Sequence, residues 1–283
     1  MSSNITGWER EKRIHFDEIV VNYDKARPTF PDELIGDVLK FTRPVHGQLA
    51  LEIGAGTGKA TTPFLNAGYD VTAVEIGSNM ADFLRDKFGG YPNFNVIVSA
   101  FEDVVLEVNR YDLVYAATSF HWIDAAIGCP KVFRLLKHGG TFALFRYNYA
   151  VDTGDKRLHE EIRAVYEKHY FTYYTGKSWQ SDEGKSKEQR KAELKEPRCM
   201  TENYGFADMS AYGFTDVTIG QYDVSRTFDA DEYIAYIDTM SDNRSLPDAN
   251  RSAFYAGIRN AIIKYGGYYT EDLIFQLYMG RKM

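Results

Sequence analysis

The 283-residue sequence contains only two cysteines, Cys129 and Cys199, and they form no CxxC pair. Their separation excludes a disulfide framework and a cysteine-based zinc site, so we expect buried structural thiols in a reducing compartment. No apolar run reaches the roughly 18–20 residues that span a bilayer. The polar N-terminal stretch also lacks the apolar centre of a secretory signal. We therefore expect a cytoplasmic protein without a membrane partner.

Acidic residues outnumber basic residues, and the net charge is −7. A field of this sign repels nucleic acid, which disfavours nucleic acid as a partner unless a local basic patch overrides it. The six histidines show no metal-ligand spacing, so we predict no metal. Nothing in the sequence indicates an oligomeric state. Tyrosine, in contrast, is abundant, with 21 residues, and its apolar body and polar tip suit pocket walls.

Strand-like and helix-like segments alternate through the first half of the chain. Short, nearly continuous apolar runs predict strands at 47–53, 69–75, 94–100, 111–118 and 140–147. The segments between them fit helices at 61–68, 78–88 and 124–137. This alternation is typical of an α/β fold whose mostly parallel sheet is covered on both faces.

The alternation breaks after residue 150. We expect a helix within 154–174 and an exposed helix or a mobile loop in the charged run 182–196. Regular structure resumes with a predicted strand at 214–229, helices at 230–241 and 248–265, and a last strand at 273–282. We therefore predict one domain made of 1–150 and 213–283, with 151–212 as an inserted lid.

The stretch LEIGAGTGKAT places three glycines, Gly54, Gly56 and Gly58, between a strand and a helix. Ligands of open α/β sheets bind at this kind of turn, and glycines let the backbone approach them closely. The dinucleotide pattern GxGxxG requires a glycine where Lys59 stands, which disfavours a nicotinamide or flavin cofactor. The spacing also differs from that of a phosphate-binding GxxxxGK[ST] loop.

Glu75 ends the second predicted strand, about 20 residues beyond the glycines. A carboxylate at this point can accept both hydrogen bonds from a ribose diol. The alternative is a glutamate that only neighbours a helix N-terminus. With the glycines in place, we favour the ribose role and expect a nucleoside-containing ligand.

Five segments in order resemble the successive motifs of class I S-adenosylmethionine-dependent methyltransferases: LEIGAGTG, VTAVEIGSNM, SAFED, YDLVYAATSFHWID and LLKHGGTFALF. The FHW segment is similar to that of the small-molecule group that includes trans-aconitate methyltransferase-like proteins. The resemblance covers 15–147, is plausible over 214–283 and is absent from 151–212. It implies a doubly wound, seven-stranded, mostly parallel sheet of Rossmann-like type with an antiparallel last strand.

The resemblance also implies the residues that bind S-adenosyl-L-methionine and its product S-adenosyl-L-homocysteine. Glu52 would orient the methionine ammonium, Arg27 would pair with the carboxylate, and Glu75 would hold the ribose. Many family members have an aspartate for the adenine amine where this chain has Ala100, and Glu102 and Asp103 are the candidates to replace it. The remaining expected contacts are the glycine loop, apolar residues on adenine, backbone groups at its edge and the end of the fourth strand, namely Tyr23, Gly54, Ala55, Gly56, Thr57, Gly58, Ile76, Met80, Phe101, Glu102, Ala116 and Ala117.

Phe120, His121 and Trp122 are the expected acceptor-pocket residues. His121 is the candidate catalytic base because imidazole titrates near neutral pH, and a structural histidine at the strand end is the alternative. Trp122 and Phe120 would shape the pocket or face the sulfonium, where an aromatic ring favours a cation.

We expect a transferase of class EC 2.1.1 that methylates a small molecule, with O-methylation of a carboxylate or hydroxyl favoured. An RNA or protein acceptor is one alternative, although no NPPY-like tetrapeptide follows the fourth strand. Cofactor binding without catalysis is the other.

Overall fold

The computed structural model describes residues 15–150, 154–174, 185–195 and 209–283. The predicted lid falls partly on residues 151–153, 175–184 and 196–208, and Cys199 also lies outside the described residues. The strands are β1 (Leu49–Ile53), β2 (Asp70–Glu75), β3 (Phe94–Val98), β4 (Tyr111–Ala117), β5 (Leu136–Tyr149), β6 (Phe214–Asp229) and β7 (Tyr268–Lys282).

Short helical turns and α-helices connect these strands. The N-terminal half contains η1 (His15–Glu18), α2 (Val20–Ala26), α3 (Asp32–Thr42), α4 (Thr61–Asn66), α5 (Ser78–Phe88), η2 (Phe120–Trp122) and α6 (Ala125–Leu135). The C-terminal half contains α7 (Lys156–His169), α8 (Lys187–Lys195), η3 (Met209–Tyr212), α10 (Ala230–Ile237), α11 (Ser241–Arg244) and α12 (Asp248–Lys264).

Within the described residues, the strands form one seven-stranded sheet in the order β3-β2-β1-β4-β5-β7-β6. The first five strands are parallel, and β7 runs antiparallel to both β5 and β6. The predicted doubly wound α/β fold with an antiparallel last strand is confirmed. The strand order reverses between β1 and β4, the point at which open α/β sheets bind their ligands.

Side chains alternate between the two faces of the central strands and enter two cores. Leu51 of β1 packs in the core under α6, whereas its neighbour Ala50 packs in the core under α3 and α4. Both faces of β1 are therefore buried, which explains why its sequence is apolar apart from Glu52.

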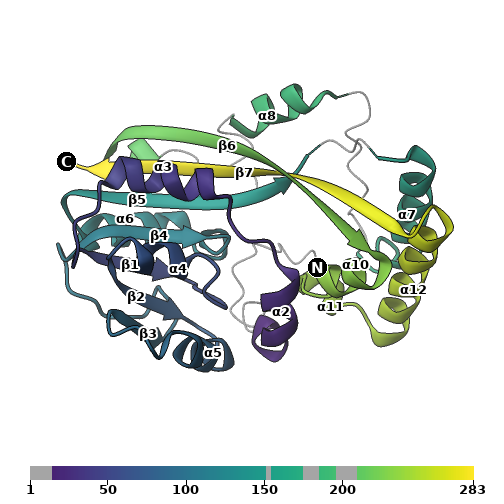
Figure 1. The fold of residues 1–283 in the computed structure, drawn as a ribbon, viewed down its shortest axis with the longest axis horizontal. Helices are drawn as coiled ribbons and strands as arrows, with labels where there is room; N and C mark the ends of the chain where they lie inside the picture. The colour runs from purple at the N-terminus through teal and green to yellow at the C-terminus, as the bar shows by residue number, and fades with distance from the viewer. Residues whose placement is uncertain (1–14, 151–153, 175–184, 196–208) are drawn as a thin grey trace.

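Three strands extend well beyond this double-covered region. β5, β6 and β7 have 14, 16 and 15 residues, and the far ends of β6 and β7 reach α7, α10 and α12 (Figure 1). A third core lies there, with Phe254 of α12 fully buried between Tyr166 and Tyr170 from the end of α7. The helices α7, α10 and α12 form a helical layer, which therefore combines residues that precede β6 with residues that follow it.

Two predicted helices have different limits in the structure. The segment 124–137 ends as a helix at Leu135, because Leu136 already pairs with Tyr111 as the first residue of β5. The segment 230–241 ends at Ile237, and the next helix, α11, begins at Ser241. In the charged run 182–196, the described part 187–195 is the helix α8.

Candidate functional site

A cavity of about 310 Å³ lies at the carboxyl ends of β1, β2 and β4. The N-terminal segment and the turn before α11 also contribute to its wall. Of the predicted site residues, the cavity is lined by Tyr23, Arg27, Glu52, Gly54, Ala55, Gly56, Thr57, Glu75, Ile76, Met80, Phe101, Glu102, Ala117, His121 and Trp122.

Three predicted residues do not line this cavity. Ala116 is buried in the core of the sheet, and Phe120 packs edge-on against Phe142 in the same core. Gly58 lies behind the loop, against α5. Phe120 was predicted to shape the acceptor pocket, but in the structure it supports the turn that carries His121 and Trp122.

The three glycines of the loop all have left-handed backbone angles, with φ of +65°, +57° and +75° for Gly54, Gly56 and Gly58. A Cβ on Gly58 would lie 2.9 Å from Leu84 Cδ2, so this glycine allows α5 to pack closely. At Gly56 the nearest atom to such a Cβ is 3.8 Å away. A side chain at Gly56 would therefore meet only the Tyr23 ring, at ordinary contact distance, so its glycine is required by the left-handed backbone rather than by packing against α5.

Glu75 holds the glycine loop and the start of α5 in place. Its carboxylate accepts hydrogen bonds from the backbone N–H of Gly56 at 2.7 Å and of Gly77 at 2.9 Å. Burial raises the pKa of Glu75, and the backbone hydrogen bonds act in the opposite direction. Each carboxylate oxygen keeps a second lone pair, so the group can still accept from a diol in the cavity.

Glu52 is the second buried carboxylate of the cavity, with 1% of its surface exposed. Its Oε2 accepts from Thr61 Oγ1 at 2.6 Å and from the Tyr115 hydroxyl at 2.9 Å, whereas its Oε1 has no partner among the described residues. Burial raises the pKa of Glu52 to about 7 despite these two donors. An approaching cation would therefore meet a preorganised and unsatisfied acceptor.

Arg27 is a partly buried cation of the cavity, whose wall also includes Lys59. Its Nη1 donates to the Tyr147 hydroxyl at 2.6 Å and its Nη2 to the backbone oxygen of Thr239 at 2.7 Å. Its buried Nε has no partner among the described residues. Arg27 and Glu52 thus offer an unsatisfied donor and an unsatisfied acceptor to one cavity, which fits a zwitterionic ligand such as an amino acid group.

The cavity also contains residues that the sequence did not reveal. Asp17 of η1 is 8% exposed and accepts from the backbone N–H of Asn79 at 3.1 Å and of Met80 at 2.7 Å, at the start of α5. Met240, Ser241 and Asp242 line the opposite wall. These contacts join residues that are more than 60 positions apart, so no local pattern could have indicated them.

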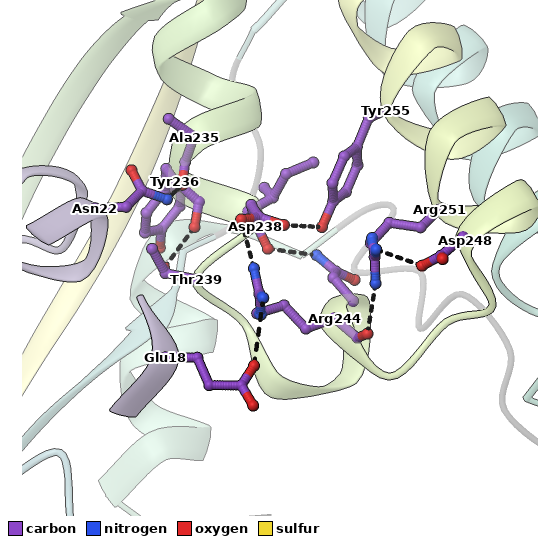
Figure 2. Close-up of polar contacts among 12 residues, drawn as sticks. Glu18, Asn22, Ala235, Tyr236, Asp238, Thr239, Arg244, Asp248, Arg251 and Tyr255 are labelled. Carbon is purple, nitrogen blue, oxygen red and sulfur yellow. Dashed lines mark hydrogen bonds and ion pairs between the residues drawn. The ribbon is translucent and has the colours of Figure 1, made fainter. Parts of the chain in front are cut away.

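The N-terminal segment is also attached to this opposite wall. Figure 2 shows Asn22 donating to the backbone oxygen of Ala235, at 3.1 Å, and Glu18 approaching Arg244, at 3.8 Å. Arg244 in turn pairs with Asp238 at 2.9 Å, and the Tyr255 hydroxyl donates to the same carboxylate at 3.0 Å. The turn between α10 and α11 is therefore held by α12 on one side and by the N-terminal segment on the other.

Parts of this chain are similar in sequence to known proteins. Residues 51–144 match the family described as a methyltransferase domain. The uncharacterized methyltransferase Mb3374 of Mycobacterium bovis is 34% identical over 149 residues, which cover 53% of this chain and 56% of that protein. Ribosomal RNA small subunit methyltransferase A of Hahella chejuensis is 41% identical over 128 residues, covering 41% of this chain and 44% of that protein. The match spans about half the length of these relatives.

Solved structures share the fold. Phosphoethanolamine N-methyltransferase 2 of Haemonchus contortus, in complex with S-adenosyl-L-methionine, superposes with a TM-score of 0.53 at 14% identity. The superposition covers 94% of this chain and 57% of that one. The predicted fold is thus confirmed, residues 51–144 are similar to the methyltransferase-domain family, and the trans-aconitate-like subgroup stays a prediction.

Two further features concern the described residues alone. No helix there is long and apolar enough to cross a membrane. No group of three or more His, Cys, Asp or Glu side chains in the same part of the chain could hold a metal ion.

Proposed function

We propose that this chain is an S-adenosyl-L-methionine-dependent methyltransferase that acts on a small-molecule acceptor. The observation that carries the proposal is that Glu52, Glu75 and Arg27 lie in one cavity, where they match the ammonium, the ribose diol and the carboxylate of this cofactor. The methyltransferase-domain match over 51–144 contains both glutamates and supports the same cofactor.

Each of these residues has one role in the proposed complex. Glu52 receives the ammonium at its unsatisfied Oε1, and Arg27 donates its Nε to the carboxylate. Glu75 accepts the ribose hydroxyls with the lone pairs that Gly56 and Gly77 leave free. Ile76 and Met80 supply apolar contact for the adenine ring.

The bound cofactor supplies an electrophilic methyl group on a sulfonium, which a nucleophile takes in one displacement that leaves a thioether. The protein then has to position the acceptor and exclude water. We place the acceptor beside His121 and Trp122, below Ser241 and Asp242. O-methylation of a carboxylate or hydroxyl is the favoured reaction, and His121 takes the proton when the acceptor is a hydroxyl.

The helical layer would close this end of the cavity. Tyr170, which follows α7, donates its hydroxyl to the Asp242 carboxylate, and the Tyr174 hydroxyl donates to the Asp242 backbone oxygen at 2.6 Å. We therefore propose that 1–150 and 213–283 hold the cofactor and that the insertion 151–212 acts as a lid, with its described helix α7 working together with α12.

Two alternatives have their own support. The relative from Hahella chejuensis is named as a ribosomal RNA methyltransferase, which favours an RNA acceptor, whereas the net charge of −7 opposes one. A protein that binds the cofactor without catalysis would keep the same cavity. Methyl transfer that nuclease treatment of a cell extract abolishes would favour RNA, and tight binding without transfer to any metabolite pool would favour the second alternative.

Titration calorimetry with S-adenosylmethionine, S-adenosylhomocysteine and NADH tests the cofactor. We expect micromolar binding of the first two and none of the third. Glu75→Ala should abolish measurable binding, whereas Glu107→Ala, which removes an exposed glutamate paired with Arg110, should not change it. Equal binding by both variants would refute the assignment of the ribose site.

A further inference from the structure

Lys131 of α6 donates hydrogen bonds to three backbone carbonyls of one short segment. Its Nζ lies 2.6 Å from the Phe101 oxygen, 3.2 Å from the Glu102 oxygen and 2.6 Å from the Val104 oxygen. An ammonium has three N–H donors, so this arrangement uses all of them. The same nitrogen lies 5.0 Å from the centre of the Phe101 ring, a favourable cation–π distance.

The segment that Lys131 holds is a tight turn. The backbone oxygen of Ala100 accepts from the N–H of Asp103 and from that of Val104, each at 3.1 Å. Lys131 binds the carbonyls that this turn directs outward. The turn is therefore fixed from within by Ala100 and from outside by α6.

Fixing a carbonyl also fixes the next N–H. The peptide bond is planar and trans, so the N–H of Glu102 points opposite to the Phe101 oxygen that Lys131 holds. Ala100, Phe101 and Glu102 all line the cavity, whereas Lys131 lies outside its wall. Lys131 thus sets the direction of a backbone donor at the edge of the cavity without touching a ligand.

This chain lacks the aspartate that many members of the resembled family carry at the position of Ala100. A fixed backbone N–H can instead distinguish adenine from hypoxanthine, because N1 is an acceptor in adenine and carries a proton in hypoxanthine. We propose that Lys131 is a positioning residue that aligns the 100–104 turn for adenine and so determines the choice of purine. The proposal rests on the proposed function.

Burial lowers the pKa of Lys131, and the neighbouring charges act in both directions. Arg134, from the same helix, lowers it further, whereas Asp103 and Glu102, from the turn, raise it. The two carboxylates help to keep the ammonium charged. A neutral isostere at this position would lose the charge-assisted part of all three hydrogen bonds.

The test compares Lys131→Met with Lys137→Met, a matched control whose lysine pairs with Asp112 and does not line the cavity. Calorimetry measures the affinities for S-adenosylhomocysteine and for its inosine analogue. We expect Lys131→Met to weaken the first about tenfold and the second little, so that the preference for adenine falls, while the control keeps the wild-type preference. Lys131→Gln, which retains one donor group, should lie between and serves if the methionine variant does not fold.

Three results would count against the proposal in different ways. An unchanged affinity for both ligands would overturn it. An equal loss for both ligands, together with a lower melting temperature, would reduce Lys131 to a structural residue and overturn its role in purine choice. Absence of binding by the wild-type protein would refute the proposed function itself, and this inference with it.

Discussion

Glu52 should make the stability of the protein depend on pH. Burial raises its folded-state pKa from 4.5 to about 7. A carboxyl whose pKa is raised on folding binds its proton more tightly in the folded state, so its contribution to stability is fully present below pH 4.5. That contribution is lost as the pH rises to about 7. The full shift corresponds to a change of about 3 kcal/mol in the free energy of unfolding.

The perturbation that isolates this effect is Glu52→Gln. The amide oxygen can still accept from Thr61 and Tyr115, and the side chain no longer ionises. Urea denaturation at intervals from pH 4.5 to pH 8 measures the free energy of unfolding of both proteins. Glu271 is a second buried carboxyl whose pKa burial raises to about 7, and Glu75 is also raised, so the variant should flatten the pH dependence only in part.

Ligand binding gives an independent measure of the same group. An ammonium placed at Glu52 Oε1 favours the ionised carboxylate, so binding of S-adenosylhomocysteine near pH 6.5 should release a proton. Calorimetry in two buffers with different ionisation enthalpies detects this release, and Glu52→Gln should eliminate it. If wild type and variant gave parallel stability curves and the same proton release, both the pKa of Glu52 and its role toward the ammonium would be wrong.

Three other predictions address the remaining parts of the site. Gly58→Ala should lower the free energy of unfolding by about 3 kcal/mol, because it combines left-handed strain with a clash against α5. Gly56→Ala should lower it by only about 1 kcal/mol, from strain alone, and should weaken cofactor binding. Equal losses of stability in denaturation experiments would contradict this difference. Asp17→Ala should lower stability by about 1 kcal/mol, because it removes the acceptor at the start of α5, and its melting curve is the check. His121→Gln should lower kcat at least 100-fold without changing cofactor affinity if the acceptor is a hydroxyl, and an unchanged kcat would leave His121 a structural role.

The central part of the fold could be predicted because its signals are local. A strand buried on both faces needs a mostly apolar run, and LALEI and the VTAV of β2 are such runs, interrupted or followed by the glutamates of the site. The glycine loop and Glu75 follow directly from these strands. Parallel strands place their carboxyl ends at one edge of the sheet, so the sequence alone predicts that the glycine loop and Glu75 lie on the same side of a ligand cavity.

The wall formed by Met240, Ser241 and Asp242 could not be predicted from local sequence signals. Met240 and the first two residues of α11, Ser241 and Asp242, carry no motif, and contacts with α12 and with the N-terminal segment hold this region at the cavity. Phe120 shows a second limit. Its neighbours His121 and Trp122 line the cavity, but in a single 3₁₀ turn successive side chains point in different directions, and the apolar ring enters the core.

The N-terminal segment connects the two walls of the cavity. On the cofactor side, Asp17 binds the start of α5, and Asp24 pairs with Lys87, which also donates to the backbone oxygen of Thr57 in the glycine loop at 2.9 Å. On the opposite side, Asn22 of the same segment binds the backbone of Ala235 in α10, and Arg27 binds the backbone of Thr239 in the turn between α10 and α11. A cofactor that engages Arg27 therefore contacts both walls through one short segment. Any displacement of α2 would therefore disturb contacts on both sides of the cavity at once.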